Sequence, residues 1–281
     1  MRLATANLRA FVTAELWRVE LTEPARHSTV TGLSLLLAIC LSFMAQAGFA
    51  AITNPAAVAS KKFQDAQMRY QKEPRNAEAA WQFARACFDL ADLATNNSQR
   101  VEVAEEGIAA CEHLLSRDPR SAPGHYYLGM NLGQVAQTRG IGALKLVTEM
   151  EREFGAARDL DSSFDYGGPD RNLGLLYSEA PSIISIGSRT RAKRHLRRAL
   201  ERAPNYPENH LNLIETYLKW NDRNEAHHEL KALEELLPRA RATFAGKAWE
   251  VSWADWEERL RKIRKKVEEP VKAIPSPRQK D

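Results

Sequence analysis

The residues of this chain whose types and spacing could do chemistry are two adjacent histidines and a pair of glycines. His227 and His228 form the only histidine cluster, and adjacent helical positions point about 100° apart, so they cannot share a metal ion. Gly140-Ile-Gly142 follows a predicted helix, whereas a dinucleotide-binding turn follows a strand, so we expect a helix–helix turn there. Metalloprotease, paired-cysteine, phosphate-loop and nucleophile-elbow motifs are absent from the sequence. We therefore expect a protein that is not an enzyme and uses no metal or cofactor.

A basic segment from Arg189 to Arg198 has the charge to bind an anionic partner. Its apolar residues fall on one stripe of a helix, so the charges occupy the remaining faces. Two interpretations stay open, a solvated helix face or a surface that binds an anionic partner protein. Arg194 and Arg198 are the candidates for partner binding. The net charge of +4 is too small for a dedicated nucleic-acid binder.

An apolar loop from Ala180 to Gly187 interrupts the helical pattern and carries Ile183, Ile184 and Ile186. Three isoleucines in one loop have to be buried in the protein, in a partner or against a ligand. Burial against the protein's own helices is one explanation. The wall of an apolar ligand channel is the other.

Helical periodicity extends over the part of the chain that contains these segments. From residue 76 to residue 240, apolar residues recur three and four positions apart, and no useful length alternates with period two. Pro74, Pro119, Pro204 and Pro238 mark predicted unit ends, and the last interval is 34 residues, the tetratricopeptide (TPR) period. We predict an all-α fold, an α-solenoid of about four TPR-like helical hairpins in residues 76–240.

The segments that flank this domain differ from it in composition. Residues 51–75 read as a small-residue linker followed by a first helix over Lys61–Lys72, and Ser98 is a candidate cap for a later helix. Residues 241–269 form a Trp-rich helix, either a cap over the last unit or a subunit interface. Residues 270–281 are rich in Lys, Pro and Gln, and we expect disorder. The apolar stripe of the Trp-rich helix is Trp249, Trp253, Trp256, Leu260, Ile263 and Val267.

Residues 1–50 have the pattern of a signal peptide or membrane anchor. No charge occurs from Ser28 to Ser60, and small residues follow an apolar run of signal-peptide length. We predict export, with an anchor over residues 29–50 as the alternative. A lipoprotein signal needs a small residue before its cysteine, whereas Ile39 precedes Cys40.

Cys87 and Cys111 remain once such a leader is removed. The predicted helices place them at an axial offset of roughly 6 Å, which makes a disulfide awkward. Two buried thiols are the simpler expectation, and pairing in an oxidising compartment is the alternative.

Several motifs together resemble the T-component (TatT) family of TRAP transporters over roughly residues 75–240. The resemblance implies a periplasmic, all-helical protein built on cryptic TPR repeats, a homo-oligomer with a hydrophobic cleft. The motifs are Gly140-Ile-Gly-Ala-Leu-Lys145, Leu160-Asp-Ser-Ser-Phe-Asp-Tyr-Gly-Gly-Pro-Asp-Arg-Asn-Leu-Gly174, Glu179-Ala-Pro181, Ile186-Gly-Ser188 and Pro204-Asn-Tyr-Pro-Glu-Asn-His-Leu211.

By this resemblance the protein is a periplasmic accessory of a TRAP-type transporter that binds its solute-binding component and a hydrophobic small molecule. The competing hypothesis is a general TPR interaction scaffold of the cell envelope. The ligand-binding candidates are Tyr126, Tyr127, Met130, Arg171, Tyr177, Ile183, Ile184 and Ile186, and Asn209 joins Arg194 and Arg198 as a partner-binding candidate.

Overall fold

The computed structural model describes residues 55–182 and 185–268. Within these ranges the chain forms ten α-helices joined by turns and short 3₁₀ segments, which confirms the predicted all-α class. The predicted leader, Ile183, Ile184 and the tail after residue 270 lie outside the described residues. None of the described helices is long and apolar enough to cross a membrane.

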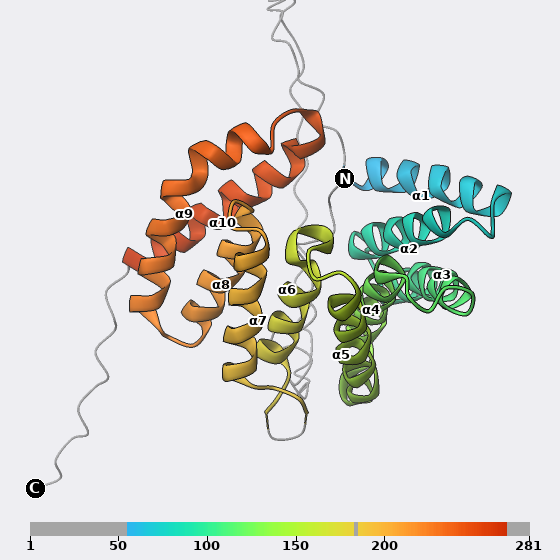
Figure 1. The fold of residues 1–281 in the computed structure, drawn as a ribbon, viewed down its shortest axis with the longest axis horizontal. Helices are drawn as coiled ribbons and strands as arrows, with labels where there is room; N and C mark the ends of the chain where they lie inside the picture. The colour runs from blue at the N-terminus through green and yellow to red at the C-terminus, as the bar shows by residue number, and fades with distance from the viewer. Residues whose placement is uncertain (1–54, 183–184, 269–281) are drawn as a thin grey trace, which may run out of the picture.

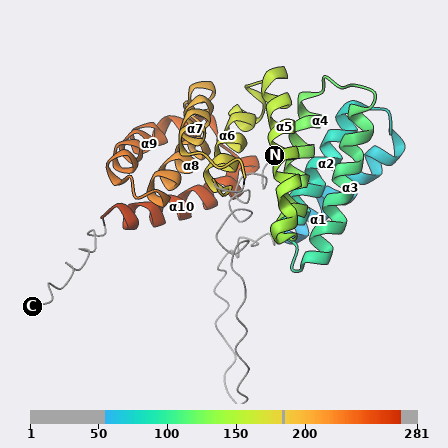
Figure 2. The same ribbon diagram turned by 90° about the horizontal axis from the view of Figure 1, so that it is seen from below.

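The helices follow one another as antiparallel hairpins from one end of an elongated molecule to the other (Figures 1 and 2). Four hairpins, α2–α3, α4–α5, α6–α7 and α8–α9, stack between α1 and α10. The bounds are α1 Pro55–Lys72, α2 Ala77–Asp92, α3 Asn97–Leu115, α4 Ala122–Ala136, α5 Ala143–Leu160, α6 Phe164–Glu179, α7 Arg189–Arg202, α8 Pro207–Lys219, α9 Arg223–Thr243 and α10 Glu250–Glu268.

A single apolar core runs through the whole stack, from Phe83 in α2 to Ile263 in α10. A lone hairpin cannot bury its apolar face, so each pair covers the face of its neighbour. The Trp-rich α10 lies against α8 and α9 and buries Trp253, Trp256 and Leu260. These contacts confirm the predicted solenoid with a C-terminal capping helix.

The first helix begins earlier than the sequence led us to expect. The residues predicted as a linker before Lys61 belong to α1, which starts at Pro55 and buries Ala59. Proline suits the first position of a helix because its missing N–H would have no partner there, and the alanines that follow are strong helix formers.

Pro238 does not end the fourth unit, contrary to the prediction. Helix α9 continues past it to Thr243, so the predicted boundary between residues 240 and 241 falls inside a helix. Pro238 is not fully buried on that helix, so water can satisfy the backbone carbonyl that loses its partner. The turn that follows contains Gly246, whose φ of 86° favours glycine.

Three smaller expectations concern a helix cap, a turn and the cysteines. The cap of α3 is Asn96, whose Oδ1 accepts from the Gln99 N–H at 2.9 Å, so the expectation for Ser98 was wrong by two residues. Residues 140–142 form a 3₁₀ turn between α4 and α5, as predicted.

Cys87 and Cys111 are buried free thiols, and burial raises the pKa of both, which makes them poor nucleophiles.

Candidate partner-binding surface

Most of the predicted ligand-binding side chains lie inside the protein. Tyr126, Tyr127, Met130, Arg171 and Tyr177 are all buried, with at most 3% of each residue exposed. Ile186 is half-buried and packs against the core. These buried candidates contact neighbouring helices inside the solenoid.

Arg171 is the centre of a buried polar cluster that joins α4, α6 and α8. Its Nη2 donates to Asp165 Oδ2 at 2.6 Å, and its Nη1 donates to Asn209 Oδ1 at 3.1 Å. The Tyr126 hydroxyl donates to the same Asp165 oxygen at 2.8 Å. Burial disfavours the charged guanidinium, but Tyr126 and Asp165 outweigh it and raise the pKa of Arg171. Asn209, predicted to face a partner, is therefore an internal contact.

The Gly-Gly-Pro motif forms the turn that holds this cluster. Asp165, Tyr166 and Gly167 have φ values of 48°, 59° and 77°, so three successive residues are left-handed. A Cβ on Gly167 would lie 2.9 Å from the backbone oxygen of Ala199 in α7, so a larger residue cannot fit there. The motif that carried the family resemblance thus has a structural role, the close approach of α6 and α7 within one hairpin.

Tyr177 links α6 to α5 and α7. Its hydroxyl donates to Glu151 Oε1 at 2.7 Å, and the Arg191 guanidinium lies 3.8 Å from the centre of its ring. Burial, and then the bond to Glu151, raises the pKa of Tyr177. This side chain also holds neighbouring helices together.

Helix α7 is amphipathic, as the basic segment predicted. Ser188 caps it, its Oγ accepting from the Arg191 N–H at 3.3 Å. Ala192, Leu196 and Ala199 are buried, and between them His195 Nδ1 lies 2.6 Å from Oδ1 of the buried Asp170. With this face fixed against α6, the opposite face of α7 is presented outward.

The outward face of α7, which we call the basic face, carries Lys193, Arg194, Arg197 and Arg198. The whole helix has seven Arg and Lys residues and one acidic residue. Lys193 and Arg197 approach Glu225 of α9 at 3.3 and 3.9 Å. Arg194 and Arg198 are exposed and form no ion pair within the described part of the chain. A shallow hollow of about 430 Å³ lies over this face.

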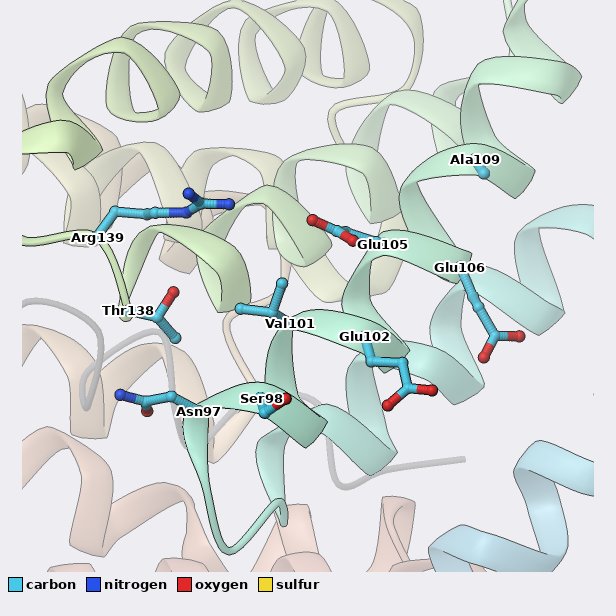
Figure 3. A pocket seen from close by; sticks show the side chains of 9 residues that line it. All are labelled: Asn97, Ser98, Val101, Glu102, Glu105, Glu106, Ala109, Thr138 and Arg139. Atoms are coloured by element: carbon cyan, nitrogen blue, oxygen red, sulfur yellow. The ribbon is translucent and has the colours of Figure 1, made fainter.

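A second hollow of opposite charge lies on α3, which we call the acidic hollow (Figure 3). In Figure 3, Thr138 and Arg139 approach from the segment after α4, and Glu102, Glu105 and Glu106 project from α3. Its volume is about 860 Å³, and Gln67 of α1 donates to Glu106 at 3.1 Å. It is a broad acidic surface on a different hairpin from the basic face.

The described residues contain no group of three His, Cys, Asp or Glu side chains placed to hold a metal ion. His227 and His228 are exposed on α9, as expected for a solvated helix face.

Comparisons with known proteins agree with this architecture. A family model described as regulator of microtubule dynamics protein 1-3 matches residues 55–152, and a tetratricopeptide repeat model matches residues 187–245. The crystal structure of TTC0263, a thermophilic TPR protein of Thermus thermophilus, superposes with a TM-score of 0.53 and 17% identity. The alignment covers 75% of this chain and 97% of that one. No curated protein matches this chain significantly.

The fold and these matches define a class, the TPR-like helical-repeat proteins. This chain is a TPR-like α-solenoid, a fold that typically serves as a non-enzymatic scaffold for protein partners. At 17% identity the solved structure shows the fold alone.

Sequence reasoning missed a second buried charge cluster, which fixes α10. Arg259 donates to Glu208 Oε1 at 2.7 Å, to Asn212 Oδ1 at 2.8 Å and to Glu215 Oε2 at 2.8 Å, all on α8. Trp256 Nε1 donates to the other oxygen of Glu208 at 2.7 Å. The three α8 residues are spaced four and three positions apart, which puts them on one helix face. That spacing is the sequence pattern from which this cluster could have been predicted.

The attachment of α10 is expected to weaken in acid. Burial raises the pKa of Glu208, but Arg259 and Arg171 outweigh burial and hold it below the ordinary 4.5. A depressed folded-state pKa gives stability that is present above the ordinary pKa and lost as the pH falls through the folded value. Urea unfolding followed by tryptophan fluorescence should show this loss at pH values below about 4.5. Glu208→Gln should reduce this loss of stability between neutral and acid pH. The same loss in the Glu208→Gln protein would contradict its assignment to Glu208.

Proposed function

We propose that this protein is a non-enzymatic interaction scaffold whose basic face binds an acidic segment of a partner protein. The observation that carries the proposal is the exposure of Arg194 and Arg198 on a rigid helix without ion-pair partners in the described structure. Buried contacts of His195 and Leu196 hold α7 in place, so the backbone that carries the two guanidinium groups is rigid.

The chemistry of arginine favours a carboxylate-rich partner. A guanidinium donates two parallel N–H groups to one carboxylate, and it is more weakly hydrated than an ammonium group, so less solvation is lost on binding. Electrostatic attraction of this kind speeds association and weakens with salt. The net charge of +4 supports a protein partner over a nucleic acid, which needs a denser basic surface.

Charge reversal on the basic face tests this function. We expect Arg194→Glu together with Arg198→Glu to weaken binding of a fluorescein-labelled Glu-rich peptide by roughly 10- to 100-fold, because two attractions become repulsions. Fluorescence anisotropy measures the affinity. The matched control is Arg75→Glu with Arg120→Glu, two arginines of the first half of the chain with the same change of net charge. Equal weakening in both variants would reject the basic face as the site.

Export and a periplasmic location are part of the proposal, supported by the uncharged stretch from Ser28 to Ser60. The proposal that the acidic partner is a TRAP solute-binding protein is supported by the motif resemblance alone. Part of that motif, around Gly167, also has a structural explanation. The match of residues 55–152 to regulators of microtubule dynamics does not choose a partner. Homo-oligomerisation stays a prediction that native mass spectrometry would check.

A further inference from the structure

A partly enclosed apolar cavity lies where the capping helix meets the last hairpin. Its volume is about 260 Å³. Its walls come from three helices: Leu211 of α8, Leu233 and Leu237 of α9, and Trp253, Trp256 and Leu260 of α10.

The polar atoms of the two tryptophans are already satisfied, so their rings offer only apolar surface to the cavity. Trp253 Nε1 donates to the Phe244 carbonyl at 2.7 Å, and Trp256 Nε1 donates to Glu208 at 2.7 Å. None of the unpartnered buried polar atoms of the described residues belongs to the lining. A water molecule between the leucines and tryptophans would lack the two to four polar partners it needs, so an apolar occupant is favoured in that part of the cavity.

The mouth of the cavity is charged. Arg241, Arg264 and Glu257 line it. Arg241 pairs with Glu257 and lies over the Trp253 ring, 4.3 Å from its centre. Arg264 pairs with Glu234 at 2.7 Å, and both side chains are well exposed. Exposed ion pairs contribute little to the free energy of folding, so these guanidinium groups can exchange a protein carboxylate for one on a ligand.

We propose that this cavity binds a medium-chain aliphatic carboxylate, its hydrocarbon chain between the leucines and tryptophans and its carboxylate at Arg241 and Arg264. A methylene group has about the volume of one water molecule in the liquid, ~30 Å³, so the cavity accommodates a chain of roughly eight or nine carbons. The site is separate from the basic face of α7, and neither proposal depends on the other.

Fluorescence quenching by a brominated fatty acid tests occupancy directly. Titration of the full chain with 8-bromooctanoate should quench tryptophan emission saturably, because the bromine reaches Trp253 and Trp256. We expect Trp253→Phe to reduce the quenched fraction and Trp220→Phe, a residue outside the cavity, to leave it unchanged. Quenching that does not saturate, or that Trp253→Phe leaves intact, would overturn the proposal.

Filling the cavity should block binding. Leu237→Phe puts a larger side chain into the cavity and should weaken binding at least tenfold, whereas Leu236→Phe, the half-buried neighbour outside the lining, should not. Leu260→Phe fills the cavity from α10 and gives the same readout where Leu237→Phe fails to fold. Equal binding to Leu237→Phe and Leu236→Phe proteins would place the fatty acid elsewhere.

The head group is tested by competition. Octanoate should displace the probe at least tenfold more effectively than octanol, and Arg241→Gln with Arg264→Gln should remove that preference. Arg239→Gln with Arg261→Gln, at exposed positions of the same two helices that do not line the cavity, should preserve it. Equal potency of octanol and octanoate on the unaltered protein would reject the carboxylate and point to an apolar side chain of a partner as the occupant.

Discussion

Replacing Arg171 with methionine is expected to lower the free energy of unfolding by about 3–5 kcal/mol. The guanidinium is 1% exposed and bonds Asp165 and Asn209, residues that belong to different hairpins. Its removal leaves the Asp165 carboxylate with one donor, Tyr126, and without a compensating charge. Urea denaturation followed by circular dichroism measures the loss.

The matched control for Arg171 is Arg158→Met. Arg158 also donates to an aspartate, Asp159 at 2.6 Å, but this pair lies at the surface of α5. A surface pair is worth less than about 1 kcal/mol, so the control protein should unfold almost as the unaltered one does. A similar small loss in both proteins would show that the buried cluster does not hold the third hairpin in place.

Replacing Arg259 with methionine is expected to release α10 from the solenoid. Arg259 contacts Glu208, Asn212 and Glu215, and its loss leaves the fully buried Glu208 carboxylate without its ion-pair partner. Breaking one partner of a buried pair costs about 3–5 kcal/mol, which exceeds what a terminal helix with few neighbours can tolerate. Hydrogen exchange read by mass spectrometry should show loss of protection in α10 and little change in α2–α5.

Arg261→Met serves as the control because Arg261 lies on the exposed side of the same helix and pairs only with Glu258 among the described residues. Its exchange pattern should match that of the unaltered protein. Retention of α10 protection in the Arg259→Met protein would mean that the tryptophan contacts alone hold the helix.

The periodicity of apolar residues was enough to predict the architecture. Ala226, Leu230 and Leu233 recur at helical spacing in the last full repeat, and all three are buried in the predicted hairpin. Stacking follows from such stripes without further information, because each apolar face needs a neighbour.

The polar candidates were harder to place because a polar residue type does not reveal its burial. Arg171 and Asn209 lie 38 positions apart in the chain, and their contact is a product of hairpin stacking. The same is true of Glu208 and Arg259, 51 positions apart. Arg194 and Arg198 were placed correctly on an exposed face because the local apolar stripe fixes which side of their own helix is buried.

Site-specific photo-crosslinking on the basic face tests the scaffold function most directly. A photoreactive amino acid would replace Arg194 in the full chain in its host cells, with His227, exposed on α9, as the control position. We predict a crosslinked partner protein at residue 194, joined through a segment rich in Asp and Glu, and absent at residue 227. Identical crosslinks at both positions, or a crosslinked segment without acidic residues, would contradict a specific acidic partner for this face.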